Sequence, residues 1–370
     1  MKLTIDRNAL MRALSHVQAV VERRNTIPIL SNILMEAEGD RLRLTATDLD
    51  IEATDAAEAK VKKAGSVTAP AQTFFDVVRK LPEGSEVVLD LSEGRLSISA
   101  GRSKFGLPTL PAADFQTMAK EAAPVKFDME AAELRRLIDK TRFAISTEET
   151  RYYLNGIYLH HAKGAKGNVL RAVATDGHRL ALAETEAPKG SDKLKGVIVP
   201  RKAVAEVRRL LDDAPEIVTV EASDSKIVFR VGEAVLTSKL IDGSFPDYQR
   251  VIPKDNNRIL TIDTKLFKAA VDRVATVSAE RSRSVKLSIS AGKLTLAVTH
   301  SESGNGVEDV EADYDAEAME IGFNAKYLLD VAGQIESDET RIEFNDAASP
   351  ARVLDAKDEG AQYVLMPLRV

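Results

Sequence analysis

The 370-residue sequence contains no cysteine and no tryptophan, and it has no long apolar run. A transmembrane helix would need roughly 20 consecutive apolar residues. Without cysteine, disulfides and thiolate metal sites are excluded, and a reducing compartment is expected. The N-terminal stretch, MKLTIDRNALMRAL, lacks the apolar segment of a signal peptide. These absences predict a cytoplasmic protein, and nothing in the sequence calls for a cofactor or a metal.

Common enzyme motifs are also missing. The chain has no phosphate-binding Gly-x-x-x-x-Gly-Lys-Ser/Thr loop, no Gly-x-Ser-x-Gly and no His-Glu-x-x-His. His160 and His161 are neighbours on an expected strand, where successive side chains face opposite ways, so one ion could hardly use both. Aromatic residues make up 5% of the chain, which disfavours a surface for stacking single-stranded bases.

The segment ATDGHRLALAE, which starts at Ala174, is the one polar cluster that resembles a catalytic site. Asp176 and His178 could belong to a hydrolytic triad, and a three-domain hydrolase is the alternative interpretation. An equivalent segment, ATDLDIE from Ala46, repeats Thr-Asp without a histidine, and no nucleophile stands out beside either copy. The sequence therefore favours a scaffold or binding role over catalysis.

Three segments open alike and indicate internal repetition. They are LTIDRNALMRAL from Leu3, VKFDMEAAELRRLI from Val125 and LTIDTKLFKAAVDRV from Leu260. Each is typical of a short strand, an aspartate near a helix N-cap, and a helix. A second strand and helix follow in each copy, which places helices at 7–21, 71–81, 131–145, 201–211, 264–277 and 324–335. We expect an α+β protein of three similar domains, 1–120, 125–248 and 252–370, each with two helices backed by antiparallel strands.

Charge is divided unevenly between these helices and the rest of the chain. The six helical windows hold 16 Lys or Arg against six Asp or Glu, although the whole chain has a net charge of −6. In the fourth helix, Arg201 and Lys202 recur seven residues later as Arg208 and Arg209. A basic stripe of this kind is typical of a phosphate-binding surface. Since the helices carry no base-reading motif, we expect binding that ignores nucleotide sequence.

The other unusual feature is the last stretch, YVLMPLRV from Tyr363, which is apolar where chain ends are commonly polar. Such an end must dock on the protein or offer a surface to a partner. Methionine at position 366 suits a pocket that accepts varied peptides.

Several segments together resemble one known family. These are RYYLNGIYL from Arg151, ATDGHRLA from Ala174, VIVPRKAV from Val197, TSKLIDGSFPDYQRVIP from Thr237 and the terminal YVLMPLRV. The resemblance is to bacterial DNA polymerase III beta subunits, the sliding clamps, and it covers essentially the whole chain. It implies the DNA-clamp fold and a head-to-tail homodimer closed into a ring, with helices lining the hole and sheets outside. It also implies a non-enzymatic processivity factor that holds double-stranded DNA and binds the polymerase catalytic subunit, the clamp loader and repair proteins through short linear peptides.

The resemblance also implies three sets of site residues. The peptide pocket would comprise Leu154, Thr175, Gly177, His178, Arg179, Leu180, Pro246, Arg250, Val251, Pro350, Val364, Met366, Pro367, Leu368 and Arg369. DNA would be contacted by Arg24, Tyr152 and Tyr153, together with Arg201 and Lys202 of the basic stripe. Glu148 and Gln72 depart from the family at two further DNA-facing positions. The dimer interface would join Lys104, Phe105 and Leu107 of one chain to Thr276 and Val277 of the other.

Overall fold

The predicted strand–helix openings are present in all three repeats of the computed structural model, which describes residues 1–22, 26–119, 121–278, 283–300 and 304–369. The opening strands are β1 (Lys2–Asp6), β10 (Val125–Glu130) and β18 (Arg258–Asp263). Asp6 caps the first helix, because its carboxylate accepts hydrogen bonds from the N–H groups of Asn8 and Ala9. Asp263 caps the fifth through the N–H of Leu266. These bonds satisfy donors that have no partner inside the helix.

All six predicted helices are confirmed, and they end one to four residues earlier than expected. They are α1 (Arg7–Gln18), α2 (Ala71–Lys80), α3 (Ala131–Thr141), α4 (Arg201–Leu210), α5 (Thr264–Ala275) and α6 (Ala325–Ala332). For α3, the hydroxyl of Thr141 donates to the carbonyl of Leu137 at 2.6 Å, and the backbone of Thr141 turns to φ −123°. The chain then tightens into a 3₁₀ turn, η3 (Arg142–Ala144), where the sequence predicted more α-helix.

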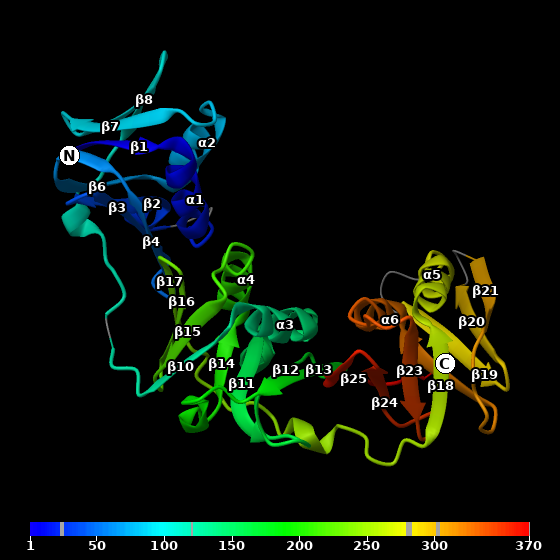
Figure 1. Cartoon of the computed structure of the whole chain (residues 1–370). Coiled ribbons are helices and arrows are strands. Elements are labelled where there is room, and N and C mark those ends of the chain that lie inside the picture. The colour runs from blue at the N-terminus through cyan, green and yellow to red at the C-terminus, as the bar shows by residue number, and fades with distance from the viewer. Residues whose placement is uncertain (23–25, 120, 279–282, 301–303, 370) are drawn as a thin grey trace. The chain divides into compact units, whose positions relative to one another are not determined.

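The chain divides into two compact units, coloured along the sequence in Figure 1. Unit 1 comprises Met1–Arg135 and Pro188–Ile241, and unit 2 comprises Arg136–Ala187 and Asp242–Val370. The first repeat therefore lies in unit 1 and the third in unit 2, while the second repeat contributes to both. The three-domain division at 1–120, 125–248 and 252–370 stays a prediction from the sequence.

Unit 1 contains two antiparallel sheets. The five-stranded sheet has the order β5 (Lys60–Lys63), β1, β7 (Glu86–Ser92), β8 (Arg95–Ala100) and β9 (Ser103–Pro108). The eight-stranded sheet has the order β10, β15 (Ile217–Ala222), β16 (Lys226–Val231), β17 (Ala234–Lys239), β4 (Ile51–Glu58), β3 (Arg41–Thr47), β2 (Asn32–Glu38) and β6 (Gly65–Pro70). Unit 1 also contains β14 (Val197–Pro200), which leads into α4.

Unit 2 is built in the same way. Seven strands follow the order β11 (Gly156–Lys163), β12 (Asn168–Thr175), β13 (Arg179–Glu186), β25 (Asp358–Leu365), β24 (Ala351–Asp355), β23 (Glu339–Phe344) and β18. A four-stranded sheet has the order β21 (Gly304–Glu311), β20 (Lys293–His300), β19 (Ser284–Ser290) and β22 (Met319–Asn324).

Neighbouring repeats share a sheet inside each unit. In unit 1, Leu236 on β17 lies opposite Ala53 on β4. In unit 2, Leu180 on β13 lies opposite Val364 on β25, and Figure 1 shows the green strand β13 beside the red strand β25. β17 and β4, and likewise β13 and β25, form antiparallel hydrogen-bonded pairs. Each pairing therefore covers an edge that both strands would otherwise leave free.

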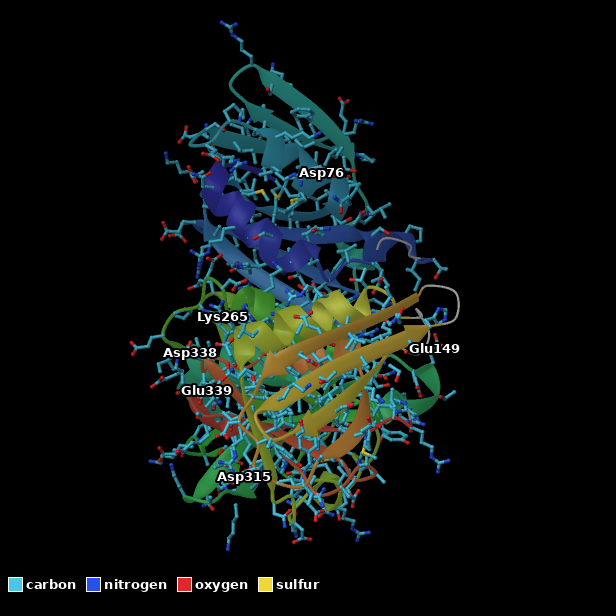
Figure 2. The ribbon with its side chains drawn as sticks, turned by 90° about the vertical axis from the view of Figure 1, so that its right-hand side faces the viewer. Asp76, Glu149, Lys265, Asp315, Asp338 and Glu339 are labelled. Carbon is cyan, nitrogen blue, oxygen red and sulfur yellow. The ribbon has the colours of Figure 1, made fainter. Side chains whose placement is uncertain are left out.

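The helices cover the sheets in pairs. α1 packs against α2 in unit 1, and α5 packs against α6 in unit 2. Phe74 on α2 and Phe267 on α5 are fully buried between helix and sheet, as the apolar face of an amphipathic helix requires. α5 starts beside β23, since the N–H of Thr264 donates to the carbonyl of Asp338 at 2.8 Å; Figure 2 shows Asp338 close to Lys265. In the described part of the chain, no helix is long and apolar enough to cross a bilayer.

Candidate functional site

The loop between β12 and β13 holds the Asp-Gly-His-Arg cluster, and Asp176 organises its turn. One carboxylate oxygen of Asp176 accepts from the N–H groups of His178 and Arg179, both at 3.0 Å. Its other oxygen accepts from the guanidinium of Arg179, also at 3.0 Å. Thr175 donates its hydroxyl to the carbonyl of Arg179 at 2.6 Å. A carboxylate engaged in this way serves as a turn-forming group.

The matching segment of the first repeat makes the same turn. The Thr47 hydroxyl donates to the carbonyl of Ile51, and Asp48 accepts from the N–H groups of Asp50 and Ile51. Leu49 has φ +77°, as Gly177 has φ +89° in the second repeat. The shared Thr-Asp pair therefore builds a tight loop in both copies, and no nucleophile is needed to explain it.

The apolar end of the chain docks against this loop. Arg179 on β13 pairs with Leu365 on β25, and the N–H of Met366 donates to the carbonyl of His178 at 2.9 Å. Two residues later, the N–H of Leu368 donates to the carbonyl of Gly322 on β22 at 2.8 Å. The structure thus brings together the two segments that set the second and third repeats apart in the sequence.

A cavity of about 300 Å³ lies where these segments meet. Nine of the pocket residues implied by the resemblance line it: Leu154, Thr175, Gly177, Arg179, Leu180, Pro246, Val251, Val364 and Met366. Arg151, Tyr153, Asp247 and Tyr248 complete the lining. Arg151, Asp247 and Tyr248 were not named from the sequence, although each lies inside a motif that carries the resemblance. The lining of this cavity is mostly apolar, and the side chain of Met366 at its rim is 40% exposed.

The other six implied pocket residues do not line this cavity. They are His178, Arg250, Pro350, Pro367, Leu368 and Arg369. The ring of His178 stacks on Tyr327 of α6 at 6.4 Å. Arg250 is exposed and pairs with Asp247 at 2.8 Å, and the carbonyl of Pro350 accepts from Asn256 at 3.0 Å. Pro367 and Leu368 are half-buried, and Arg369 is exposed.

Arg179 is a buried cation, and each of its three guanidinium nitrogens donates a hydrogen bond within the protein. It contacts Asp330 of α6 at 2.5 Å, Asp176 at 3.0 Å and the carbonyl of Phe143 at 2.6 Å. The guanidinium also lies 4.4 Å from the centre of the Tyr327 ring. A buried charge is tolerated only with such compensation. Arg179 therefore ties the loop to α6 and η3, and its remaining capacity to bond a peptide is small.

Gly177 leaves room for the side chain of Arg151. A Cβ atom at this position would lie 2.6 Å from Nη1 of Arg151, in addition to the positive φ. Arg151 itself pairs with Glu148 at 3.3 Å. The guanidinium of Arg151 thus lies over the loop at the cavity rim.

Models of one protein family match nearly the whole chain. They describe the N-terminal, central and C-terminal domains of the DNA polymerase III beta subunit and match residues 1–119, 128–247 and 249–369. The chain belongs to the DNA polymerase III beta subunit family. The beta sliding clamp of Caulobacter vibrioides is 59% identical over 372 residues, and that of Escherichia coli K12 is 38% identical, with full coverage of both chains in each case.

Solved sliding clamps also match in structure. The DNA polymerase sliding clamp from Caulobacter crescentus has a TM-score of 0.94 at 59% identity and covers 100% of both chains. The DNA polymerase III subunit beta from Bartonella birtlesii, bound to griselimycin, has a TM-score of 0.97 at 49% identity, also with 100% of both chains. The predicted family, the α+β DNA-clamp fold and the sliding-clamp function are confirmed. A clamp is a processivity factor without catalytic activity, and nothing supports the hydrolase alternative.

The DNA-facing residues expected of this clamp are in different environments. Arg24 lies outside the described residues. Tyr152 is 54% exposed and meets Tyr153 edge to face, 5.8 Å between ring centres. Arg201 is exposed at the start of α4, and no hydrogen bond or ion pair holds it within the described ranges.

Lys202, by contrast, is committed to neighbours in unit 1. Its ammonium contacts Glu22, lies 2.5 Å from Asp48, and donates to the carbonyl of Val20 at 2.9 Å. Burial lowers the pKa of Lys202, but the hydrogen bonds to Asp48 and Glu22 outweigh it and raise the pKa above its ordinary value. Lys202 therefore joins the first repeat to the second, a role that its position in a basic stripe did not reveal.

The two departures from the family have local partners as well. Gln72 accepts from Gln18 and donates to Asp76, both at 2.9 Å. Glu148 is held by Arg151, as described above. The side-chain amide of Gln72 and the carboxylate of Glu148 are thus bonded to neighbouring side chains of the same chain.

The expected dimer residues lie on the edge strand β9 and just after α5, where Thr276 is the helix C-cap and Val277 follows it. β9 is the last strand of the five-stranded sheet, with Lys104 and Phe105 exposed and Leu107 buried. β21 is the last strand of the four-stranded sheet, and its Val307 is 64% exposed. Val277 packs beside this strand, because a Cβ added at Gly306 would lie 3.3 Å from its methyl group. Val307 was missed in the sequence, where an apolar residue among acidic neighbours gave little signal.

Proposed function

We propose that this sliding clamp forms a head-to-tail ring of two chains around duplex DNA in the cytoplasm. There it tethers the polymerase catalytic subunit, the clamp loader and repair proteins through short linear peptides. The observation that carries the peptide role is the pairing of β13 with β25, which joins the Asp-Gly-His-Arg loop and the apolar chain end around one cavity. Extended peptides with aliphatic or aromatic anchors suit such a mostly apolar cleft.

In the proposed ring, the edge strand β9 of one chain meets the edge strand β21 of the other. β9 and β21 end different sheets in different units, so an interface between them is heterologous. Two such contacts close a two-chain ring if the rotation permits. The exposed side chains of Phe105 and Val307 supply apolar area, and pairing would protect both edges from unspecific association.

The DNA role rests on the basic helices. Arg201 is the exposed member of its stripe with no partner in the described structure, so its guanidinium is available for a phosphate. Contacts to phosphate alone carry no sequence information and give the ring no preferred register. Because a closed ring is linked topologically to the DNA, it does not need high affinity to stay bound. Weak phosphate contacts then give only a small energy barrier to sliding.

Retention on closed DNA tests this function. The clamp is loaded on a nicked circular plasmid, and the retained fraction is measured by gel filtration before and after one restriction cut. A ring should stay on the circle and leave the linear product. Equal retention on both molecules would rule out encirclement.

A further inference from the structure

Behind one wall of the cavity, two side chains from adjacent strands meet the hydroxyl of Tyr248. His160 on β11 places Nε2 at 3.0 Å from this hydroxyl, and Arg171 on β12 places Nη1 at 2.9 Å. Arg171 is held in turn by Glu184 on β13, at 2.6 and 2.8 Å. His160 is 8% exposed and Tyr248 is 6% exposed.

The hydrogen bonds fix which nitrogen of His160 carries the proton. The guanidinium of Arg171 can only donate, so the Tyr248 oxygen accepts from it and the hydroxyl proton points to Nε2 of His160. Nδ1 of His160 lies 3.1 Å from the carbonyl of His161 and must donate to it. This pattern corresponds to a neutral His160 with its proton on Nδ1, because Nε2 is then free to accept the Tyr248 hydroxyl proton.

The surroundings favour this neutral form. Burial lowers the pKa of His160, the hydrogen bond to the His161 carbonyl opposes that shift, and the positive charge of Arg171 adds to the lowering. A protonated ring beside Arg171 would also leave the Tyr248 hydroxyl proton without an acceptor.

His160 also belongs to an aromatic stack. Tyr158 lies against it with 4.6 Å between ring centres, and the other face of this stack is Phe245, 4.9 Å from Tyr158 and tilted by only 5°. Phe245 directly precedes Pro246, the first cavity residue of its segment. Both the start of the segment and Tyr248 are thus anchored to β11.

The ring of Tyr248 connects this network to the cavity. It packs with Leu180 and Val364, which line the cavity from β13 and β25. The short turn η6 (Tyr248–Arg250) continues into Val251, and the segment 246–251 supplies Pro246, Asp247, Tyr248 and Val251 to one wall of the cavity. Nothing in this wall belongs to a long helix or strand that would hold it otherwise.

We propose that His160 and Arg171 are positioning residues for partner peptides, which they serve by fixing Tyr248 and with it the wall at 246–251. This inference rests on the proposed peptide role of the cavity. If the wall already has its bound conformation, peptide binding does not have to order it and avoids that entropic cost. The peptide then binds more tightly, although it does not contact His160.

The test uses the full-length clamp and a fluorescein-labelled peptide derived from the polymerase, measured by fluorescence anisotropy. His160→Leu removes the acceptor and should weaken the peptide about fivefold, the scale of one lost hydrogen bond. His160→Gln keeps a side-chain acceptor and should restore most of the affinity. A rescue of this kind distinguishes hydrogen bonding from simple packing.

A double-mutant cycle then links the two residues. In a Tyr248→Phe clamp, which keeps the ring and lacks the hydroxyl, His160→Leu should cause no further loss. If His160→Leu weakens the peptide by the same factor in the Tyr248→Phe clamp as in the wild type, the proposal is overturned. Wild-type affinity in the His160→Leu single variant would also overturn it. If His160→Leu fails to fold, as judged by thermal melting, the comparison of Tyr248→Phe with wild type decides in its place, and unchanged affinity there refutes the inference.

A pocket control separates this inference from the function on which it rests. Met366→Ala alters the cavity lining and removes no member of the hydrogen-bond network. If Met366→Ala leaves the peptide unaffected, the cavity is not the peptide site and the proposed function itself fails. If Met366→Ala weakens the peptide and the His160 and Tyr248 variants do not, only the positioning role is wrong.

Discussion

Leu180 on β13 and Val364 on β25 face each other across an antiparallel strand pair and both line the same cavity. One residue belongs to the second repeat and the other to the last strand of the third. The cavity therefore exists only where two repeats share a sheet, and neither repeat could form it alone.

Removal of the chain end should abolish peptide binding. Deleting residues 366–370 takes away the Met366 side chain and the two backbone bonds that dock the terminus on His178 and Gly322. A single Met366→Ala change keeps those bonds and should cost about 1–2 kcal/mol of peptide affinity, the usual scale for truncating an interface anchor. Fluorescence anisotropy with a labelled polymerase peptide measures both variants.

Sliding on DNA provides the control for this experiment. The β9 and β21 edges and the basic helices are intact in the truncated chain, so ring formation and retention on circular DNA should persist. If the truncated clamp binds the peptide as well as wild type does, the cavity has been assigned to the wrong ligand.

Gly177→Ala should also weaken the peptide, for a different reason. The new Cβ would fall 2.6 Å from Nη1 of Arg151, and alanine at φ +89° adds strain of about 1 kcal/mol or more. Arg151 must move from its place over the loop. In the double variant Arg151→Ala, Gly177→Ala the clash is absent, so the alanine at 177 should cost less there than in the wild-type background.

Calorimetric titration with the same peptide would compare these four proteins. Equal costs of Gly177→Ala with and without Arg151 would show that backbone strain alone is responsible.

Sequence patterns predicted the helices, because helices depend on local signals. The meeting of the two unusual segments was implied by the resemblance to the clamp family and by no local pattern. Asp6 and Asp263 mark helix starts, and apolar spacing gives the buried face. The Thr-Asp turn was also readable, since its copy at Thr47 and Asp48 lacks any histidine. Such features are encoded within a few neighbouring residues.

Long-range polar contacts could not be read in the same way. Lys202 lies in a basic stripe, yet its ammonium bonds Asp48 and Glu22 of another repeat. The hydroxyl of Tyr248, from the turn η6, joins His160 on β11 to Arg171 on β12. Both depend on which strands become neighbours and on side-chain geometry, which no periodicity specifies.

Arg201 and Lys202 should therefore behave differently despite their adjacency. Arg201→Ala should weaken binding of the unloaded ring to duplex DNA, and the slope of log affinity against log salt should fall by about one for each phosphate that the variant no longer neutralises. Lys202→Met should instead lower the stability of the clamp by about 1 kcal/mol, because Asp48 loses its cation and the site is partly screened by solvent.

Lys62→Ala is the matched control, since Lys62 is an exposed cation on β5, away from the helices. It should change neither the salt dependence nor the melting temperature. An Arg201→Ala clamp with the wild-type salt slope would remove Arg201 from the DNA-contacting set.

The dimer edges allow the last and sharpest test. Leu107 was expected at the interface, but it is only 6% exposed, so a charge there would disturb its own sheet. Phe105 on β9 and Val307 on β21 are 41% and 64% exposed and can carry aspartate without entering a core. Each single variant, Phe105→Asp or Val307→Asp, should sediment as a monomer, because the change places a charge in both interfaces of the ring.

Mixing the two variants tests the direction of the contact. A Phe105→Asp chain keeps an intact β21 edge, and a Val307→Asp chain keeps an intact β9 edge, so a head-to-tail interface leaves one good contact per mixed pair. The mixture should form an open dimer in analytical ultracentrifugation while failing to stay on circular DNA. If the interface instead paired β9 with β9 or β21 with β21, mixing would restore no β9–β21 contact. A mixture that stays monomeric would therefore contradict the proposed ring, and so would single variants that stay dimeric.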